Sequence, residues 1–173
     1  MSPSRTKTDD RWSELSRQEL IALGRTTVTE RLENLGCTVT PPSSRIGGKL
    51  DVETPSGRRL EVFVSTQRLG GYVFWTKRRF TPATNRFAAI VLLAEAEDPD
   101  VYLVPSTEWR KASPPLTDRP NVGKRSEPEY GISLARSSLL LRRLSQSQAT
   151  TCPCLSHQCV GRVGWQSKLP SIR

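Results

Sequence analysis

The spacing of apolar residues near the start of the chain predicts one amphipathic helix. Helical spacing links the apolar positions Leu20, Leu23, Val28, Leu32 and Leu35. Either Ser13 or Ser16 can cap this helix, and the run Ser16-Arg17-Gln18-Glu19 matches a capping box. Gly36 is suited to end it. Gly24 lies inside the pattern and indicates either a break or close packing.

Shorter apolar runs further along the chain predict strands, at residues 37–40, 50–53, 59–66, 72–76, 87–94 and 101–104. The segment Pro55-Ser56-Gly57 predicts a hairpin turn. In the strand that follows, Leu60, Val62 and Val64 share one face, while Glu61, Phe63 and Ser65 share the other. The almost unbroken apolar run from Phe87 is typical of a strand that is buried on both faces.

The remaining segments define the expected domain. Ser106 is expected to cap a helical turn that carries Trp109, and residues 113–130 to form a loop. Residues 132–144 suggest a short strand followed by a helix. The element order predicts an α/β (α+β) sheet with one long helix packed across it. We expect a disordered arm at residues 1–12, a folded domain at 13–144 and a disordered tail at 145–173.

The charge balance indicates the kind of partner. The formal net charge is +9 and the pI about 9.9, so nucleic acid is the natural partner, because phosphate contacts release bound counterions. The alternative is a basic surface that serves only solubility. The sequence has no apolar run long enough to span a bilayer and no signal peptide, and its four cysteines do not suggest a disulfide scaffold. These features predict a cytoplasmic protein without a membrane partner.

The middle of the chain resembles the PD-(D/E)XK (restriction-endonuclease-like) nuclease superfamily. The layout of helix, strand, a glycine three residues before Asp51, and a hairpin into a valine-alternating strand is shared with it. More closely, the chain looks like an uncharacterised bacterial family of that superfamily over about residues 15–140. The runs that carry this likeness begin at Tyr72 (YVFWTK), Phe87 (FAAIVLL) and Val101 (YLVPS follows it). The resemblance implies a central mixed sheet flanked by helices.

The resemblance also implies a chemistry, namely Mg²⁺-dependent phosphodiester hydrolysis. In this superfamily an Asp and a Glu hold the metal, and a Lys two residues after the Glu helps to activate water. Asp51 matches the family's Asp. If the valines set the register, Phe63 takes the carboxylate position and Ser65 the lysine position. If the register moves back by two, Glu61 supplies the carboxylate and Phe63 takes the lysine position. Neither register contains the lysine.

A displaced basic residue could compensate for the missing lysine. Lys49 shares a strand face with Asp51, and Lys77 lies on or just after the predicted strand at residues 72–76, which is rich in aromatic residues. The predicted catalytic set is therefore Asp51, Glu61 and Lys49, with Asp51 and Glu61 as Mg²⁺ ligands if the protein is active. Members of the superfamily often carry a further glutamate on the helix, for which the candidates are Glu19, Glu30 and Glu33.

Residues 58–86 contain seven Arg or Lys and one acidic residue, interleaved with aromatic residues. Cations among aromatic rings suit phosphates and stacked bases. The predicted phosphate contacts are Arg68, Lys77, Arg78 and Arg79. The candidates for stacking are Tyr72, Phe74, Trp75 and Phe80. The alternative is that the aromatic rings enter the core while the cations are solvated.

The end of the chain holds a Cys152, Cys154, His157 and Cys159 cluster. These residue types suit zinc, but four ligands within eight residues is a poor spacing. The alternative is a disordered tail whose cysteines are incidental. Such a tail could also be a non-native extension.

These observations support three functions. The preferred one is a nucleic-acid-binding domain of nuclease-like fold, with DNA favoured over RNA, that is catalytically degenerate. The second is a Mg²⁺-dependent DNA endonuclease with a displaced lysine. The third is a protein-interaction or regulatory module.

Overall fold

The computed structural model describes residues 12–40, 48–68, 71–93 and 98–134. Residues 1–11 of the predicted arm, the predicted tail, the possible zinc ligands at Cys152–Cys159 and the predicted helix after residue 134 lie outside these ranges. Trp12, the last residue of the predicted arm, is described and is buried in the core beneath α1. The described elements are α1 (Arg17–Asn34), β1 (Thr38–Thr40), β2 (Lys49–Glu53), β3 (Arg59–Arg68), β4 (Tyr72–Thr76), β5 (Arg86–Leu93), β6 (Asp100–Pro105), the 3₁₀ helix η1 (Ser106–Lys111), β7 (Leu116–Arg119) and β8 (Glu129–Ser133).

Five of the described strands form a mixed sheet in the order β1-β2-β3-β5-β6. The pair β3 and β5 is parallel, and the other neighbours are antiparallel. A second sheet has the order β4-β8-β7 and is antiparallel throughout. The predicted α/β (α+β) class with a central mixed sheet is confirmed by this strand pairing.

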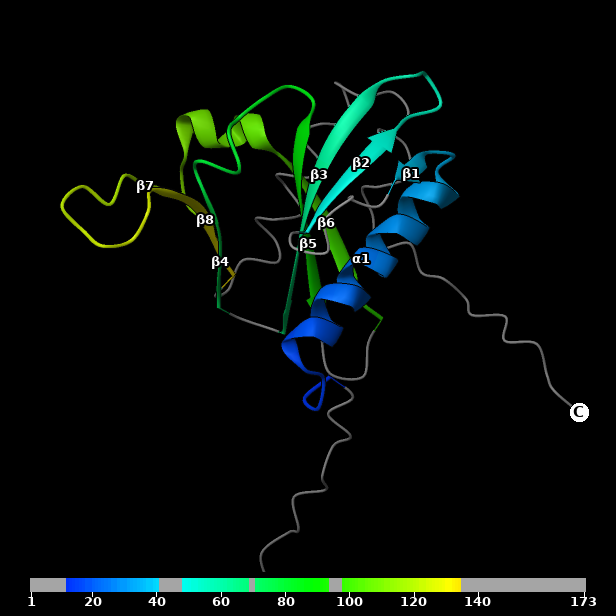
Figure 1. Cartoon of the computed structure of the whole chain (residues 1–173), viewed down its shortest axis with the longest axis horizontal. Coiled ribbons are helices and arrows are strands. Elements are labelled where there is room, and N and C mark those ends of the chain that lie inside the picture. Colours follow the sequence, from blue (N-terminus) through cyan, green and yellow to red (C-terminus); the bar gives the residue numbers. More distant parts are fainter. Residues whose placement is uncertain (1–11, 41–47, 69–70, 94–97, 135–173) are drawn as a thin grey trace, which may run out of the picture.

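Helix α1 covers one face of the mixed sheet (Figure 1). Its capping box is confirmed, since the Ser16 hydroxyl accepts from the Glu19 N–H and the Glu19 carboxylate accepts from the Ser16 N–H. Gly36 ends the helix with φ of +79°, a conformation that favours glycine. The buried side chains Val28 and Leu32 pack against Val62 and Val91 of the sheet. Within the described residues, no helix is long and apolar enough to cross a membrane.

The small sheet and η1 lie on the other side of the mixed sheet (Figure 1). This second core contains Ile90, Trp109 and Ile132, all of which are almost completely buried. The prediction that residues 113–130 form only loop is wrong, because β7 lies within them. Leu116 anchors β7 by entering the second core. A four-residue strand among prolines and charges has too short an apolar pattern to be recognised alone.

The predicted capping role of Ser106 is also wrong. η1 has no side-chain cap. Instead the Ser106 hydroxyl donates to the Ala83 carbonyl at 2.9 Å and accepts from the Ala83 N–H at 2.8 Å. This completely buried hydroxyl therefore ties the segment before β5 to the end of β6.

Gly24 allows α1 to approach β3 closely. A Cβ added at this position would lie 1.7 Å from Oγ1 of Thr66. That hydroxyl oxygen is buried and has no hydrogen-bond partner. The sequence pattern allowed either a break in the helix or close packing at Gly24. The structure shows close packing in a continuous helix.

We therefore expect Gly24→Ala to lower the free energy of unfolding by about 1–3 kcal/mol through overpacking. Thr66→Ala alone should cost little, because its hydroxyl makes no hydrogen bond. In the double variant the overlap with Oγ1 disappears, a tight Cβ contact of 3.1 Å remains, and alanine gains about 1 kcal/mol of helix propensity, so the loss of stability should be smaller than in Gly24→Ala. Urea unfolding of all three variants measures this coupling, and a double variant as unstable as Gly24→Ala would contradict it.

Candidate functional site

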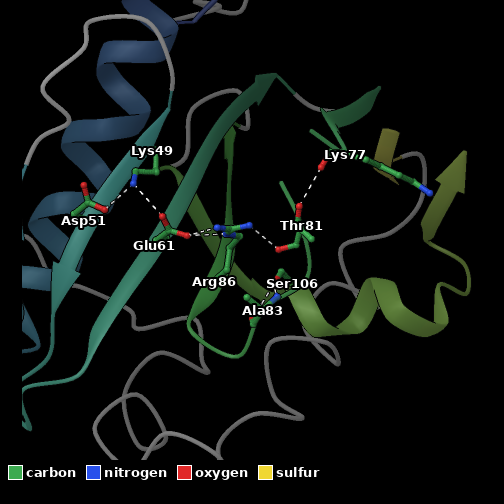
Figure 2. Close-up of polar contacts among 8 residues, drawn as sticks. All are labelled: Lys49, Asp51, Glu61, Lys77, Thr81, Ala83, Arg86 and Ser106. Atoms are coloured by element: carbon green, nitrogen blue, oxygen red, sulfur yellow. Dashed lines mark hydrogen bonds and ion pairs between the residues drawn. The ribbon is translucent and has the colours of Figure 1, made fainter. Parts of the chain in front are cut away.

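The antiparallel pairing of β2 with β3 brings the predicted catalytic residues together. Asp51 lies directly opposite Glu61, and Lys49 lies directly opposite Phe63. All four side chains lie on the face of the sheet that is opposite to α1, because their neighbours on each strand enter the core beneath the helix. Figure 2 shows Lys49, Asp51 and Glu61 converging at this place.

Lys49 bridges the two carboxylates. Its Nζ lies 2.9 Å from Oδ1 of Asp51 and donates to Oε1 of Glu61 at 3.0 Å. The Asp51 side chain remains half exposed. Of the two displaced lysines that the sequence suggested, the structure brings Lys49 to the carboxylates.

Arg86, the first residue of β5, holds the other oxygen of Glu61. Its Nε donates to Oε2 of Glu61 at 2.8 Å, and its Nη2 donates to the same oxygen. Nη1 donates to the Thr81 carbonyl at 2.7 Å, which fixes the guanidinium from the other side (Figure 2). Each oxygen of Glu61 therefore faces a cation. We call Lys49, Asp51, Glu61 and Arg86 the charge cluster.

These contacts shift two pKa values. Burial of Glu61 opposes its ionisation, but the hydrogen bonds and charges of Arg86 and Lys49 outweigh burial and hold the pKa of Glu61 below its ordinary value. The hydrogen bond to Asp51, followed by the hydrogen bond to Glu61, raises the pKa of Lys49. The charge cluster is thus composed of two anions and two cations that stabilise each other.

The strand pairing favours one of the two registers that the sequence left open. Glu61, and not Phe63, lies opposite Asp51, which agrees with the register in which the resemblance gives the carboxylate position to Glu61 and the lysine position to Phe63. The Phe63 side chain is 9 % exposed and packs edge-on against Phe80, with ring centroids 5.2 Å apart. In the register that the strand pairing favours, the position at which the resemblance predicts a lysine therefore holds a buried ring.

Lys77 is directed away from the charge cluster (Figure 2). Its ammonium pairs with the Asp118 carboxylate of β7 and lies 4.6 Å from the centroid of the Tyr130 ring. It therefore joins β7 and β8 to the turn after β4, and it does not replace the missing lysine.

The other predicted phosphate contacts differ in their surroundings. Arg68 donates to the carbonyl oxygens of Trp12, Ser13 and Leu15, so its guanidinium holds the turn before α1. Arg78 and Arg79 are both exposed just after β4. Arg78 makes one long ion pair of 3.8 Å with Glu127.

The helix glutamates are not part of the charge cluster. Glu19, Glu30 and Glu33 lie on α1, which covers the opposite face of the sheet. Glu19 serves the capping box, where hydrogen bonds with Ser16 lower its pKa.

The charge cluster does not fit Mg²⁺ in this arrangement. A divalent cation needs carboxylate oxygens without competing positive charge, whereas both oxygens of Glu61 and Oδ1 of Asp51 already face a cation. In addition, the described residues contain no group of three or more His, Cys, Asp or Glu side chains suited to a metal.

Sequence reasoning missed Arg86 as a site residue. Its partner Glu61 lies 25 positions earlier, and the two meet because β3 and β5 are parallel neighbours with Glu61 and Arg86 in register. The order of strands in a sheet is needed to see this. The one feature of the sequence that could have pointed to Arg86 is its place directly before the apolar run that begins at Phe87.

A second polar group, on the outer face of the small sheet, was also missed. The Tyr72 hydroxyl donates to Oε1 of Glu129 at 3.0 Å, which leaves the Thr117 hydroxyl to donate to Tyr72 at 2.9 Å. Arg119 also contacts Glu129, at 3.4 Å. Burial, followed by the hydrogen bond to Glu129, raises the pKa of Tyr72.

No protein-family model matches the sequence, and no curated protein is detectably similar to it. Among solved structures, the chain is similar to Hjc, a Holliday junction resolvase from the archaeal hyperthermophile Archaeoglobus fulgidus. The identity is 10 %, the TM-score is 0.37, and the match covers 66 % of this chain and 84 % of that one. A likeness at this level assigns neither an activity nor a substrate to this chain.

The charge cluster should make stability depend on pH at both ends of the scale. The lowered pKa of Glu61 means that its contribution is present above its ordinary value of 4.5 and is lost as pH falls through the lower folded value. The raised pKa of Lys49 means that its contribution is present below 10.5 and is lost as pH rises through the higher folded value.

We expect Glu61→Gln to lower the free energy of unfolding near neutral pH by about 1.5–3 kcal/mol, the range for a hydrogen bond to a charged group. The difference from the unchanged protein should shrink toward acid pH. Glu53→Gln is the control, because the Glu53–Arg59 pair is exposed and 4.0 Å long. Urea unfolding between pH 3 and 8 measures both, and a Glu61→Gln protein with unchanged stability throughout would refute the role given to this carboxylate.

Proposed function

We propose that this chain is a nucleic-acid-binding domain of nuclease-like fold whose hydrolytic site is degenerate. The observation that carries the proposal is the state of Glu61, each oxygen of which is bound by a cation of the chain itself. The buried Phe63 at the lysine position supports it as well. A carboxylate neutralised in this way stabilises the sheet and is withdrawn from metal binding.

The charge of the chain supports the binding half of the proposal. Two of the predicted phosphate contacts, Arg78 and Arg79, are exposed side by side after β4. The whole chain has 26 Lys and Arg against 17 Asp and Glu, a balance that favours polyanions. The preference for DNA over RNA rests on the resemblance to DNA nucleases alone.

Binding is tested with the full chain and a labelled DNA duplex in a mobility-shift assay. We expect binding at roughly 50 mM salt that weakens steeply as salt rises. The double variant Arg78→Ala/Arg79→Ala should reduce the slope of log K against log salt by up to about 2, because each phosphate contact contributes about 0.9. An RNA duplex of the same length should bind more weakly.

The matched control is Arg17→Ala, which also removes an exposed arginine but at the start of α1, on the other side of the mixed sheet. A salt slope that falls equally in Arg17→Ala would show a diffuse attraction rather than a contact by Arg78 and Arg79. No binding to a duplex or to a single strand at roughly 50 mM salt would end the proposal.

A Mg²⁺-dependent endonuclease is the second candidate, and one observation favours it. Lys49 lies directly opposite Phe63 and touches both carboxylates, so an ammonium group is present one strand away from the expected position. In this candidate, Asp51 and Glu61 would hold the metal after release from their present cations. Lys49 would remain to orient water.

Plasmid nicking with Mg²⁺ or Mn²⁺ separates the two candidates. We expect no nicking that depends on Asp51, so the unchanged protein and Asp51→Ala should give the same background. Asp51 is half exposed, so its removal should leave the fold intact, which circular dichroism checks. Nicking by the unchanged protein that Asp51→Ala abolishes would overturn the degenerate site and establish the endonuclease.

A further inference from the structure

The outer face of the small sheet carries an unusual exposed aromatic ring. Phe74 of β4 is 54 % exposed. Among the residues that the structure describes, no other aromatic side chain is as exposed. The neighbouring inward-facing residue Val73 is buried in the second core, which fixes the direction of Phe74. The sequence suggested four stacking candidates, and the structure places Trp75 and Phe80 within or against the core instead.

Tyr72 stacks against this exposed ring. The Tyr72 and Phe74 rings are nearly parallel, with centroids 6.1 Å apart and planes at 19°. Gly131 lies beneath Tyr72, and a Cβ there would come within 2.0 Å of the Tyr72 hydroxyl. The glycine thus lets the ring lie across β8 to reach Thr117 on β7.

A cation is built into the same surface. The guanidinium of Arg119 lies 4.3 Å from the centroid of the Tyr72 ring, and its side chain is 53 % exposed. Glu129 holds both Tyr72 and Arg119 from below, so neither group needs to be ordered when a ligand arrives. We call Tyr72, Phe74 and Arg119 the aromatic platform.

The positive charge of the described residues is concentrated around the aromatic platform. The described ranges contain 16 Arg and Lys against 13 Asp and Glu. Residues 72–79 and 116–133, which include the small sheet, contain six of these cations and three of the acids, and so account for the whole excess of three. The three acids are paired, with Lys77, Arg78 and Arg119.

We propose that the outer face of the small sheet binds single-stranded nucleic acid, with an unpaired base stacked on Phe74 and the adjoining phosphates near Arg119, Arg78 and Arg79. An exposed ring whose stacked neighbour, Tyr72, carries a guanidinium suits a base, because every base has a π-face and the adjacent phosphate carries negative charge. A duplex keeps its base faces covered and cannot use Phe74. The inference rests on the proposed function and names the form of nucleic acid.

The test measures the fluorescence anisotropy of three labelled probes with the full chain. They are an oligothymidine longer than a typical site of about 4–16 nucleotides, an abasic strand of equal length and a DNA duplex. Phe74→Ala should weaken oligothymidine binding about five- to 150-fold, the range expected for one stacked base. Its binding to the abasic strand and to the duplex should stay within about twofold.

Two variants make the result specific. Phe74→Trp keeps a stacking ring and should bind oligothymidine as well as the unchanged protein or better. Ile21→Ala removes an exposed apolar side chain from α1 and should change nothing, since α1 lies on the other side of the mixed sheet. Thermal unfolding of each variant checks that the fold is kept.

The other outcomes overturn the inference in distinguishable ways. If Phe74→Ala binds oligothymidine as tightly as the unchanged protein does, stacking is excluded while the proposed function stands. If Phe74→Ala instead turns a dimer into a monomer in light scattering and leaves oligothymidine affinity unchanged, the face is a protein interface. If the unchanged protein binds none of the three probes, the proposed function itself fails.

Discussion

Strand β5 is buried on both faces from Phe87 to Leu93, so the protein must cover both sides of its central sheet. Helix α1 covers one side through Val28 and Leu32, and the small sheet with η1 covers the other through Ile132 and Trp109. Burial of such side chains contributes about 1.5–3 kcal/mol each. The position of the small sheet, and with it the exposure of its outer face, follows from this two-sided burial.

The same strand explains why the charge cluster is neutralised. Arg86 is the first residue of β5 and is in register with Glu61 on β3, so the parallel pairing that builds the core also delivers a guanidinium to the carboxylate. Lys49 arrives from the opposite side by antiparallel pairing. A partly buried carboxylate needs such partners, because an uncompensated charge there is costly. Glu61 therefore links three strands through charge, and its role in the sheet competes with any role in binding a metal.

Features that depend on local sequence could be predicted, whereas contacts that depend on the order of strands in the sheet could not. Ser16, Glu19 and Gly36 define α1 through local chemistry, so the sequence was sufficient for them. The face shared by Asp51 and Lys49 could also be predicted, because alternation along a strand is local. The contact of Arg86 with Glu61 could not, since it depends on which strands are neighbours. The short strand β7 was missed for a related reason: its stability comes from Leu116 entering a core formed by distant segments.

The charge cluster and the aromatic platform lie in two different sheets and use charge in opposite ways. In the charge cluster, two cations and two anions balance, and Phe63 and Phe80 pack beside them. Around the aromatic platform, Arg119 and Arg78 are paired with acids, whereas Arg79, Lys124 and Arg125 supply an excess of cations, near the Phe74 ring that is 54 % exposed. A surface that binds a polyanion needs the second arrangement, because the attraction depends on charge that the protein has not itself neutralised. The two arrangements therefore divide the molecule as proposed, with the small sheet offering a surface for a polyanion and the charge cluster of the central sheet serving stability.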